Sequence, residues 1–202
     1  MWALVLAADV AFLAVAFGLR TVHSYRRTGR SGWLRPVSRV DAVAESLCTA
    51  GCVGTLAAPV LARLSVVPPA GRLSSGPVAA VGLACLLAGI VTSLAAQRQM
   101  GLAWKPGIDP AAPPPLVTTG LFRVARNPFY VGCMLSSLGV ALAVPSVLAL
   151  ASLAAVVVAA EVVVRWVEEP FLEGVHGEAY RAYRRATARF LPGPARWRAL
   201  RP

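Results

Sequence analysis

The chain has 202 residues, of which 57% are hydrophobic and only 14% are charged, and its formal net charge is +11. An ordinary soluble domain of this length needs a larger polar surface than this composition supplies. The composition therefore excludes that class and predicts a single membrane domain over residues 1–202.

Five apolar runs follow one another along the chain. A helix needs about 20 residues to cross a bilayer core of roughly 30 Å. The runs that reach or approach this length are Met1–Leu19, Val40–Leu64, Pro77–Ala96, Tyr130–Val144 and Ser146–Val164. The last two, split at Pro145, should form a tight hairpin of helices. Because both are short, four spans with a hairpin that dips in and returns remain an alternative.

This pattern predicts an all-α integral membrane protein with about five transmembrane helices, a C-terminal helical hairpin and a cytosolic amphipathic tail. Residues 1–96 hold the N-terminal helices, and residues 97–202 hold a polar loop, the hairpin and the basic tail, Arg165–Pro202. Asp9 interrupts the first run and no basic residue precedes it. We therefore expect a retained first helix rather than a cleaved signal.

The basic residues predict the orientation. Eighteen of the 20 Lys and Arg residues fall in the loops on one side of a five-span layout, and the other side has only Arg63 and Arg72. The positive-inside rule then places the N-terminus outside and the C-terminus in the cytoplasm. We expect the membrane to be a bacterial plasma membrane.

Two kinds of partner are not expected. The basic residues stand between apolar runs, so no soluble basic domain offers a nucleic acid a groove. The four cysteines lie in apolar runs and have no His or Asp companion that completes a metal site; they are Cys48, Cys52, Cys85 and Cys133. Membrane lipids are the partners that this composition predicts.

A first cluster of motifs lies just before the hairpin. Thr118-Thr119-Gly120 is typical of a turn, and Arg126-Asn127-Pro128 of a helix start with Asn127 as N-cap and Pro128 in first position. The first amides of such a helix can bind an anion such as a carboxylate. An ordinary basic cap on a transmembrane helix is the alternative interpretation.

A second cluster ends the last apolar run. Glu161, Arg165 and Glu168 or Glu169 share one face at helical spacing. Acidic residues at a membrane boundary are unfavourable unless they are paired or functional. The alternative is a solvated set of salt bridges at a helix end.

A third cluster lies in the tail. Tyr180 and Tyr183 form an aromatic edge on a short helix that also carries arginines, namely Arg181, Arg184 and Arg185. Taken alone, this pattern indicates an interfacial helix on an anionic membrane.

The order of these motifs resembles the isoprenylcysteine carboxyl methyltransferase family and, more loosely, the related phospholipid methyltransferases. The resemblance covers about Leu116–Pro192. It rests on Leu116-Val117-Thr118-x-Gly120-Leu121-Phe122-Arg123, Arg126-Asn127-Pro128-x-Tyr130-x-Gly132, the hairpin, Glu168-Glu169-x-x-Leu172, Gly177-x-x-Tyr180-x-x-Tyr183 and Phe190-Leu191-Pro192.

The resemblance implies a pocket for S-adenosylmethionine between the hairpin and the cytosolic tail. The cofactor-binding residues that it implies are Leu116, Val117, Thr118, Gly120, Phe122, Arg126, Asn127, Pro128, Tyr130, Glu168 and Glu169. The catalytic residues that it implies are Glu168 and, facing the substrate, Arg165. Two positions depart from the family pattern. Asn127 stands where the family usually has His, and Arg165 precedes Glu168 by three residues where the family spacing is four.

The function expected from the sequence is S-adenosylmethionine-dependent methyl transfer to a lipophilic small molecule or a lipid. Carboxyl, amine, thiol and hydroxyl acceptors all remain open. One alternative is an NADPH-dependent membrane reductase of the sterol-reductase type, which resembles this chain around the Arg-x-Pro-x-Tyr turn. Another is a non-enzymatic scaffold or transporter subunit, in which acidic residues line a polar path; the candidates are Asp9, Asp41, Glu45 and Glu161.

Overall fold

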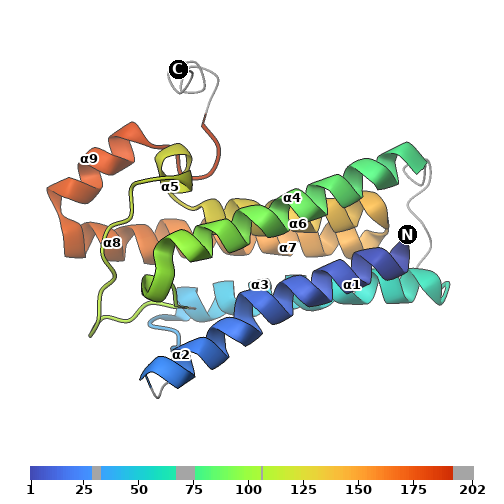
Figure 1. Ribbon diagram of the computed structural model, residues 1–202, viewed down its shortest axis with the longest axis horizontal. Helices are drawn as coiled ribbons and strands as arrows, with labels where there is room; N and C mark the ends of the chain where they lie inside the picture. Colours follow the sequence, from blue (N-terminus) through green and yellow to red (C-terminus); the bar gives the residue numbers. More distant parts are fainter. Residues whose placement is uncertain (29–32, 67–75, 106, 193–202) are drawn as a thin grey trace.

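The computed structural model describes residues 1–28, 33–66, 76–105 and 107–192, and this part of the chain forms a helical bundle without a β-strand (Figure 1). The elements are α1 (Trp2–Leu13), a π-helical turn (Ala14–Leu19), α2 (Arg20–Thr28), α3 (Arg39–Arg63), α4 (Gly76–Met100), a 3₁₀ turn (Gly101–Ala103), α5 (Leu121–Val124), α6 (Pro128–Ala143), α7 (Val147–Val163), a second π-helical turn (Val164–Glu168), α8 (Glu169–His176) and α9 (Glu178–Ala186).

Four continuous helices in the described ranges are long and apolar enough to cross a membrane: Trp2–Arg26, Arg39–Arg63, Gly76–Met100 and Val147–His176. The fifth apolar helix, α6, has 16 residues. At 1.5 Å per residue it is about 24 Å long, a little shorter than a bilayer core of roughly 30 Å. The prediction of an all-α membrane protein with about five apolar helices is confirmed.

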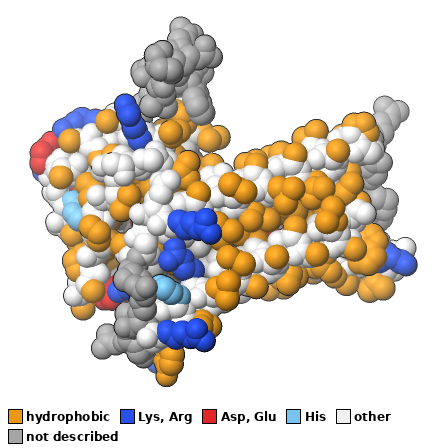
Figure 2. Space-filling model, viewed as in Figure 1, with side chains coloured by type: hydrophobic (Ala, Val, Ile, Leu, Met, Phe, Trp, Pro, Cys, Tyr) orange, Lys and Arg blue, Asp and Glu red, His pale blue; other side chains and the backbone are white. Residues whose placement is uncertain are grey.

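The chain runs back and forth along the bundle, so that its N-terminus and the pair α8 and α9 lie at opposite ends (Figure 1). We call the end that carries α2, the start of α3, the end of α4, α5, α8 and α9 the basic end. Apolar side chains cover the length of the bundle and most Lys and Arg side chains gather at the basic end (Figure 2). At the far end, Arg63 lies over the ring of Trp2, 5.7 Å from its centroid. Arg72, the other basic residue predicted on this side, lies outside the described residues.

The predicted hairpin is α6 and α7, which pack together and are joined by residues 144–146. Ser146 caps α7, since its Oγ accepts a hydrogen bond from the amide of Ala149 at 3.2 Å. The last helix continues past the predicted boundary at Val164 to His176. Pro170 does not stop it because this proline lies in the first turn after the second π-helical turn, where a missing N–H is best tolerated.

Small residues allow α4 and α6 to approach closely. Gly82 and Gly89 on α4 face Gly132 and Gly139 on α6, and a Cβ added to Gly132 would lie 2.6 Å from the backbone oxygen of Gly89. Such close backbone contact is the way in which transmembrane helices gain packing energy without a hydrophobic drive. α6 is thereby held at a fixed depth and rotation, which positions its N-terminal residues.

Buried polar side chains tie these helices further. The Oγ of Ser93 donates to the carbonyl of Phe129 at 3.1 Å, and the Nε2 of Gln97 donates to the carbonyl of Ala16 at 2.9 Å. Buried polar groups in a membrane helix are stable only when bonded in this way. These two bonds connect α4 to the start of α6 and to the first π-helical turn.

Candidate functional site

The site is built where the segment after α9 crosses the start of α6. Ala125 and Ala188 form a parallel bridge. The amide of Arg126 donates to the carbonyl of Ala188 at 2.8 Å, and the amide of Asn127 donates to the carbonyl of Arg189 at 3.1 Å. Residues far apart in the sequence are thereby joined beside the hairpin.

Asn127 occupies the predicted N-cap position of α6, and Pro128 the first helical position. The side chain of Asn127, however, makes no capping bond. Instead, its Nδ2 donates to the carbonyl of Arg189 at 3.1 Å. Asn127 therefore joins the tail to α6 with both its backbone and its side chain. A side-chain amide can do this because it carries a donor where the carboxylate of an aspartate would carry none.

Glu169 is the centre of a buried ion cluster, which we define as Arg126, Glu169 and Arg189. Glu169 is only 5% exposed. Arg189 binds it with two bonds, Nε to Oε1 at 2.9 Å and Nη2 to Oε2 at 2.8 Å, and Nη2 of Arg126 lies 2.6 Å from Oε1. Bidentate arginine–carboxylate pairs are among the strongest hydrogen bonds in proteins. This ion cluster fastens α8, the start of α6 and the tail to one another.

Most hydrogen-bond donors of the Arg126 guanidinium are bonded within the protein itself. Its Nη1 donates to the carbonyls of Thr187 and, at 3.1 Å, of Arg184. Its Nε is buried and has no hydrogen-bond partner among the described residues. A buried donor without a partner is unfavourable unless a ligand supplies the acceptor.

Glu168 belongs to a different network from Glu169. Its Oε1 accepts a hydrogen bond from the hydroxyl of Tyr130 at 2.6 Å. Within the described part of the chain, its Oε2 receives no hydrogen bond. Glu168 can therefore still accept a hydrogen bond from a ligand amine or hydroxyl while Tyr130 fixes its position.

An aromatic wall lies next to Tyr130. The ring of Phe129 contacts the rings of Tyr130, Trp104 and Phe17, with centroids 5.6, 5.6 and 6.2 Å apart. Edge-on arrangements of this kind are favourable for aromatic pairs. These contacts bring the first π-helical turn to the start of α6, next to Tyr130.

Arg165 lies on the surface, and its partner Glu161 also approaches the ion cluster, with Oε2 3.9 Å from Nη1 of Arg189. It pairs with Glu161 at 3.3 Å, and the two side chains are 52% and 42% exposed. The predicted common face of Glu161, Arg165 and Glu168 is interrupted because the second π-helical turn changes the angular spacing of the residues that follow Val163. The structure thus brings Glu168 to Tyr130 and leaves Arg165 on the outer surface.

The tyrosine edge of α9 faces the protein rather than a membrane surface. Tyr180 is 2% exposed, and the hydroxyl of Tyr183 donates to the carbonyl of Phe122 at 2.6 Å. Burial raises the pKa of Tyr180 to about 12, so it stays protonated. The exposed face of α9 carries ion pairs instead, and hydrogen bonds from Arg185 and Arg181 lower the pKa of Glu178 to about 2.

The segment of residues 116–120 and the start of α5 contain the remaining predicted residues. Leu116 and Val117 are half-buried, Thr118 is exposed and Phe122 is buried. Gly120 has a φ of +59°, and a Cβ there would lie 2.6 Å from Oε1 of Gln99. Glycine meets both demands, since it tolerates positive φ and leaves the room that this close approach needs.

Sequence reasoning missed three residues of the site. Arg189 had no detectable signal, because nothing in its local pattern links it to Glu169. Phe17 and Trp104 are too far from the motifs in sequence to suggest the aromatic wall. The sequence places Gln97 in the polar loop, because it directly follows the apolar run Pro77–Ala96, whereas the structure extends α4 to Met100 and buries Gln97.

A family model matches the segment of the chain that contains most of this site. Residues 78–179 match the family model of phospholipid methyltransferase. That range covers α4, the hairpin, Tyr130 and the Glu168–Glu169 pair. No curated protein matches the chain. The chain therefore belongs to the phospholipid methyltransferase family, which includes the isoprenylcysteine carboxyl methyltransferases, and it is an integral membrane methyltransferase.

Proposed function

We propose that this protein transfers a methyl group from S-adenosylmethionine to a lipophilic small molecule or a lipid. The observation that carries the proposal is the Tyr130–Glu168 hydrogen bond at 2.6 Å, held beside the buried ion cluster within the family-matched segment. The arrangement places fixed polar side chains at the end of an apolar bundle. An enzyme that joins a charged cofactor to an apolar substrate needs both environments at one place.

The residues present fit the cofactor chemically. S-adenosylmethionine carries an amino group, ribose hydroxyls and a carboxylate, and when bound it supplies an electrophilic methyl group. Oε2 of Glu168 can accept from an amine or hydroxyl, and Nε of Arg126, which is buried without a partner in the described chain, can donate to a carboxylate. Tyr130 holds Glu168 in place. The segment from Leu116 to Phe122, which the hydroxyl of Tyr183 joins to α9, is proposed to belong to the same site.

The chain's own contribution to catalysis is positioning and the exclusion of water. Holding two reactants in a near-attack geometry can supply several kcal/mol of the barrier, roughly 7–11 in the best cases. Phe129 and Trp104 provide the apolar wall that keeps the reacting atoms dry. No side chain has to exchange a proton with the sulfonium for this chemistry.

Arg165 is the proposed contact for the acceptor. It lies at the junction of α7 and α8 and is paired only with the exposed Glu161 in the described chain. A weak surface ion pair of this kind is easily exchanged for another anion. An acceptor carboxylate could replace Glu161 and be held by both arms of the guanidinium.

The basic end is proposed to face the cytoplasm, with the N-terminus outside. The basic side chains cluster at that end (Figure 2), as the positive-inside rule requires of a cytoplasmic face. Cofactor would then enter from the cytoplasm and the lipophilic acceptor from the bilayer.

Calorimetry on the detergent-solubilised full chain tests the cofactor site. Wild type should bind S-adenosylmethionine and S-adenosylhomocysteine, and Glu168→Gln should bind at least about tenfold more weakly. Glu178→Gln is the matched control, because the Glu178 side chain is 65% exposed and its ion pairs with Arg181 and Arg185 lie on the outer face of α9. Equal affinity in wild type and Glu168→Gln would contradict the assignment of the cofactor site to Glu168. Binding of NADPH in place of both ligands would favour the reductase alternative. Labelling of a lipid extract with a methyl-tritiated donor then identifies the acceptor.

A further inference from the structure

An open pocket of about 410 Å³ lies between the first helix and α4, outside the proposed cofactor site. The residues that line it are Val15, Leu19, Arg20, His23, Leu94, Gln97 and Arg98. Its volume is within the range of small-molecule sites. Nothing in the proposed methyl transfer uses it.

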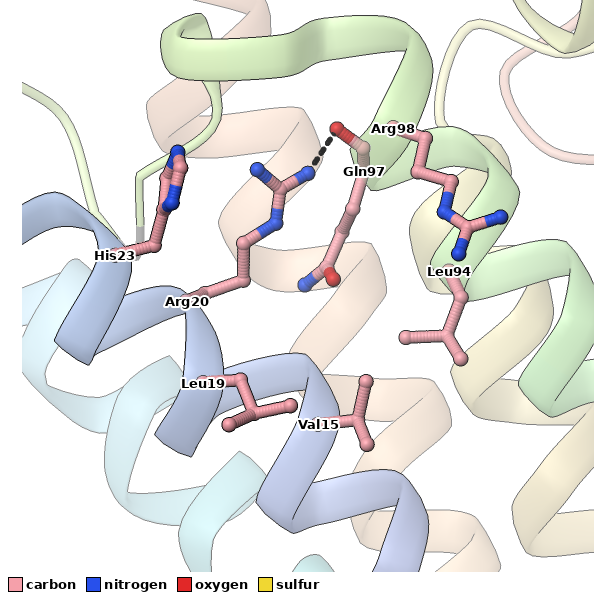
Figure 3. A pocket seen from close by; sticks show the side chains of 7 residues that line it. All are labelled: Val15, Leu19, Arg20, His23, Leu94, Gln97 and Arg98. Carbon is pink, nitrogen blue, oxygen red and sulfur yellow. Dashed lines mark hydrogen bonds between the residues drawn. The ribbon is translucent and has the colours of Figure 1, made fainter.

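The lining changes character along the bundle axis. Val15, Leu19 and Leu94 form the part further from the basic end, while Arg20, His23 and Arg98 form the part nearer to it (Figure 3). In a membrane, the first part faces the hydrocarbon and the second lies at the depth of the lipid headgroups. The pocket is therefore amphipathic in the direction in which a lipid molecule is.

In the described chain, no carboxylate compensates the charge of the pocket. Arg20 donates to the carbonyls of Gly101, at 3.2 Å, and of Gln97, and its guanidinium lies 5.8 Å from the centroid of the Trp104 ring. In the ranges that the structure describes, neither Arg20 nor Arg98 forms an ion pair with a carboxylate. Two like charges that line one pocket repel each other, and an anion between them would relieve this.

The bonds of Arg20 also fix its position. Gln97 and Gly101 lie at the C-terminal end of α4, where carbonyls lack intrahelical partners and attract cations. Arg20 thus spans from α2 to α4 as a preformed wall of the pocket (Figure 3). Basic residues at a span end would satisfy the topological rule without any pocket, so the concave shape is what distinguishes this place.

We propose that this pocket binds a lipid with an anionic phosphate headgroup. The phosphate lies against Arg20 and Arg98, with His23 as a further donor, and an acyl chain follows Val15, Leu19 and Leu94. The inference does not rest on the proposed methyl transfer, because it concerns binding alone.

Native mass spectrometry of the full-length protein in neutral detergent tests the proposal. Phosphatidylglycerol should bind at a saturable site, and phosphatidylcholine with the same acyl chains should bind at least about tenfold more weakly. Arg98→Gln should weaken phosphatidylglycerol binding by roughly tenfold, the loss expected for one charge-assisted contact. Arg98 is exposed, so this variant should fold normally, which its melting curve checks.

Arg26→Gln is the matched control, since Arg26 is exposed on the same helix as Arg20 but does not line the pocket. It should leave the affinity unchanged. An equal loss in both variants would show diffuse attraction and overturn the proposal, as would equal binding of the two lipids. Glycerol phosphate distinguishes the two possible sources of the phosphate group, a lipid headgroup and a soluble phosphate. We expect it to bind far more weakly than phosphatidylglycerol, and equal affinity would assign the pocket to a soluble phosphate and overturn the lipid assignment.

Discussion

Glu168 and Glu169 are neighbours in the chain but belong to separate hydrogen-bond networks. Glu168 accepts from Tyr130 at 2.6 Å, and Glu169 is held by Arg126 and Arg189 at 2.6 to 2.9 Å. Successive residues on a helix point in directions about 100° apart, so one carboxylate faces the proposed cofactor and the other faces the tail. The two should therefore respond differently to substitution.

Glu169→Gln should destabilise the protein. Removal of the charge leaves the buried Arg126, with a side chain 7% exposed, without its counter-ion. Breaking a buried pair costs about 3–5 kcal/mol, and because Arg189 is partly exposed we expect a loss near the lower end. Thermal melting in detergent measures it. Glu178→Gln, whose arginine partners are on the surface, should melt almost as wild type does, and similar shifts for both variants would contradict the buried ion cluster.

Tyr130→Phe should weaken cofactor binding without unfolding the protein. The phenyl ring keeps its contact with Phe129, and only the hydrogen bond to Glu168 is lost. A loss of about 1 kcal/mol corresponds to roughly fivefold in affinity. Calorimetry with S-adenosylhomocysteine gives the number, and Tyr25→Phe, at an exposed tyrosine, serves as the control. Unchanged affinity in Tyr130→Phe would mean that Glu168 needs no positioning.

Gly132→Ala should be strongly destabilising for so small a change. The added methyl group would lie 2.6 Å from the backbone oxygen of Gly89, so α4 and α6 would have to separate. Overpacking of this kind costs about 1–3 kcal/mol. Gly174→Ala is the matched control, because nothing lies within 4 Å of its added Cβ, and it should be neutral or slightly stabilising as an alanine in a helix. Equal melting temperatures would argue against the close helix contact.

Arg165→Ala and Arg165→Lys should melt normally while turnover falls. The pair with Glu161 is exposed, and such pairs contribute about 0–1 kcal/mol. If Arg165 orients the acceptor, methyl transfer should fall by about tenfold or more in both variants, with cofactor binding retained. Lysine keeps the charge but lacks the planar fork. Full activity in Arg165→Lys would show that the positive charge alone suffices and would exclude the proposed bidentate contact with the acceptor.

A reporter fused after Pro202 should give a cytoplasmic signal, and one inserted in the loop between α3 and α4 should give an external signal. The reason is the concentration of Lys and Arg at the basic end, which cytoplasmic faces favour. The paired fusions check each other, since five crossings place them on opposite sides. Signals from the same side would contradict the predicted orientation. Both layouts place these two fusions on opposite sides, so a reporter in the turn between α6 and α7, residues 144–146, distinguishes them: a cytoplasmic signal there would restore the alternative with a hairpin that does not cross.

The sequence by itself determined that this is a membrane protein built of about five apolar helices with a hairpin near its C-terminal end. A bilayer permits few structures for an apolar run of about 20 residues, because every backbone group must be bonded internally, and so length and hydropathy are sufficient. The motifs from Leu116 to Tyr183 also indicated the correct family, since their order and spacing are properties of the sequence alone.

Only the tertiary structure decided which of these residues meet. Three relationships depend on how distant segments pack: the bidentate pair of Arg189 with Glu169, the contact of Phe17 with Phe129 and the surface position of Arg165. The π-helical turn at Val164–Glu168 also changed the face on which Glu168 lies. Helical periodicity describes one element at a time, whereas these relationships depend on the contact of several elements, which is fixed by close packing of glycine and serine faces between helices.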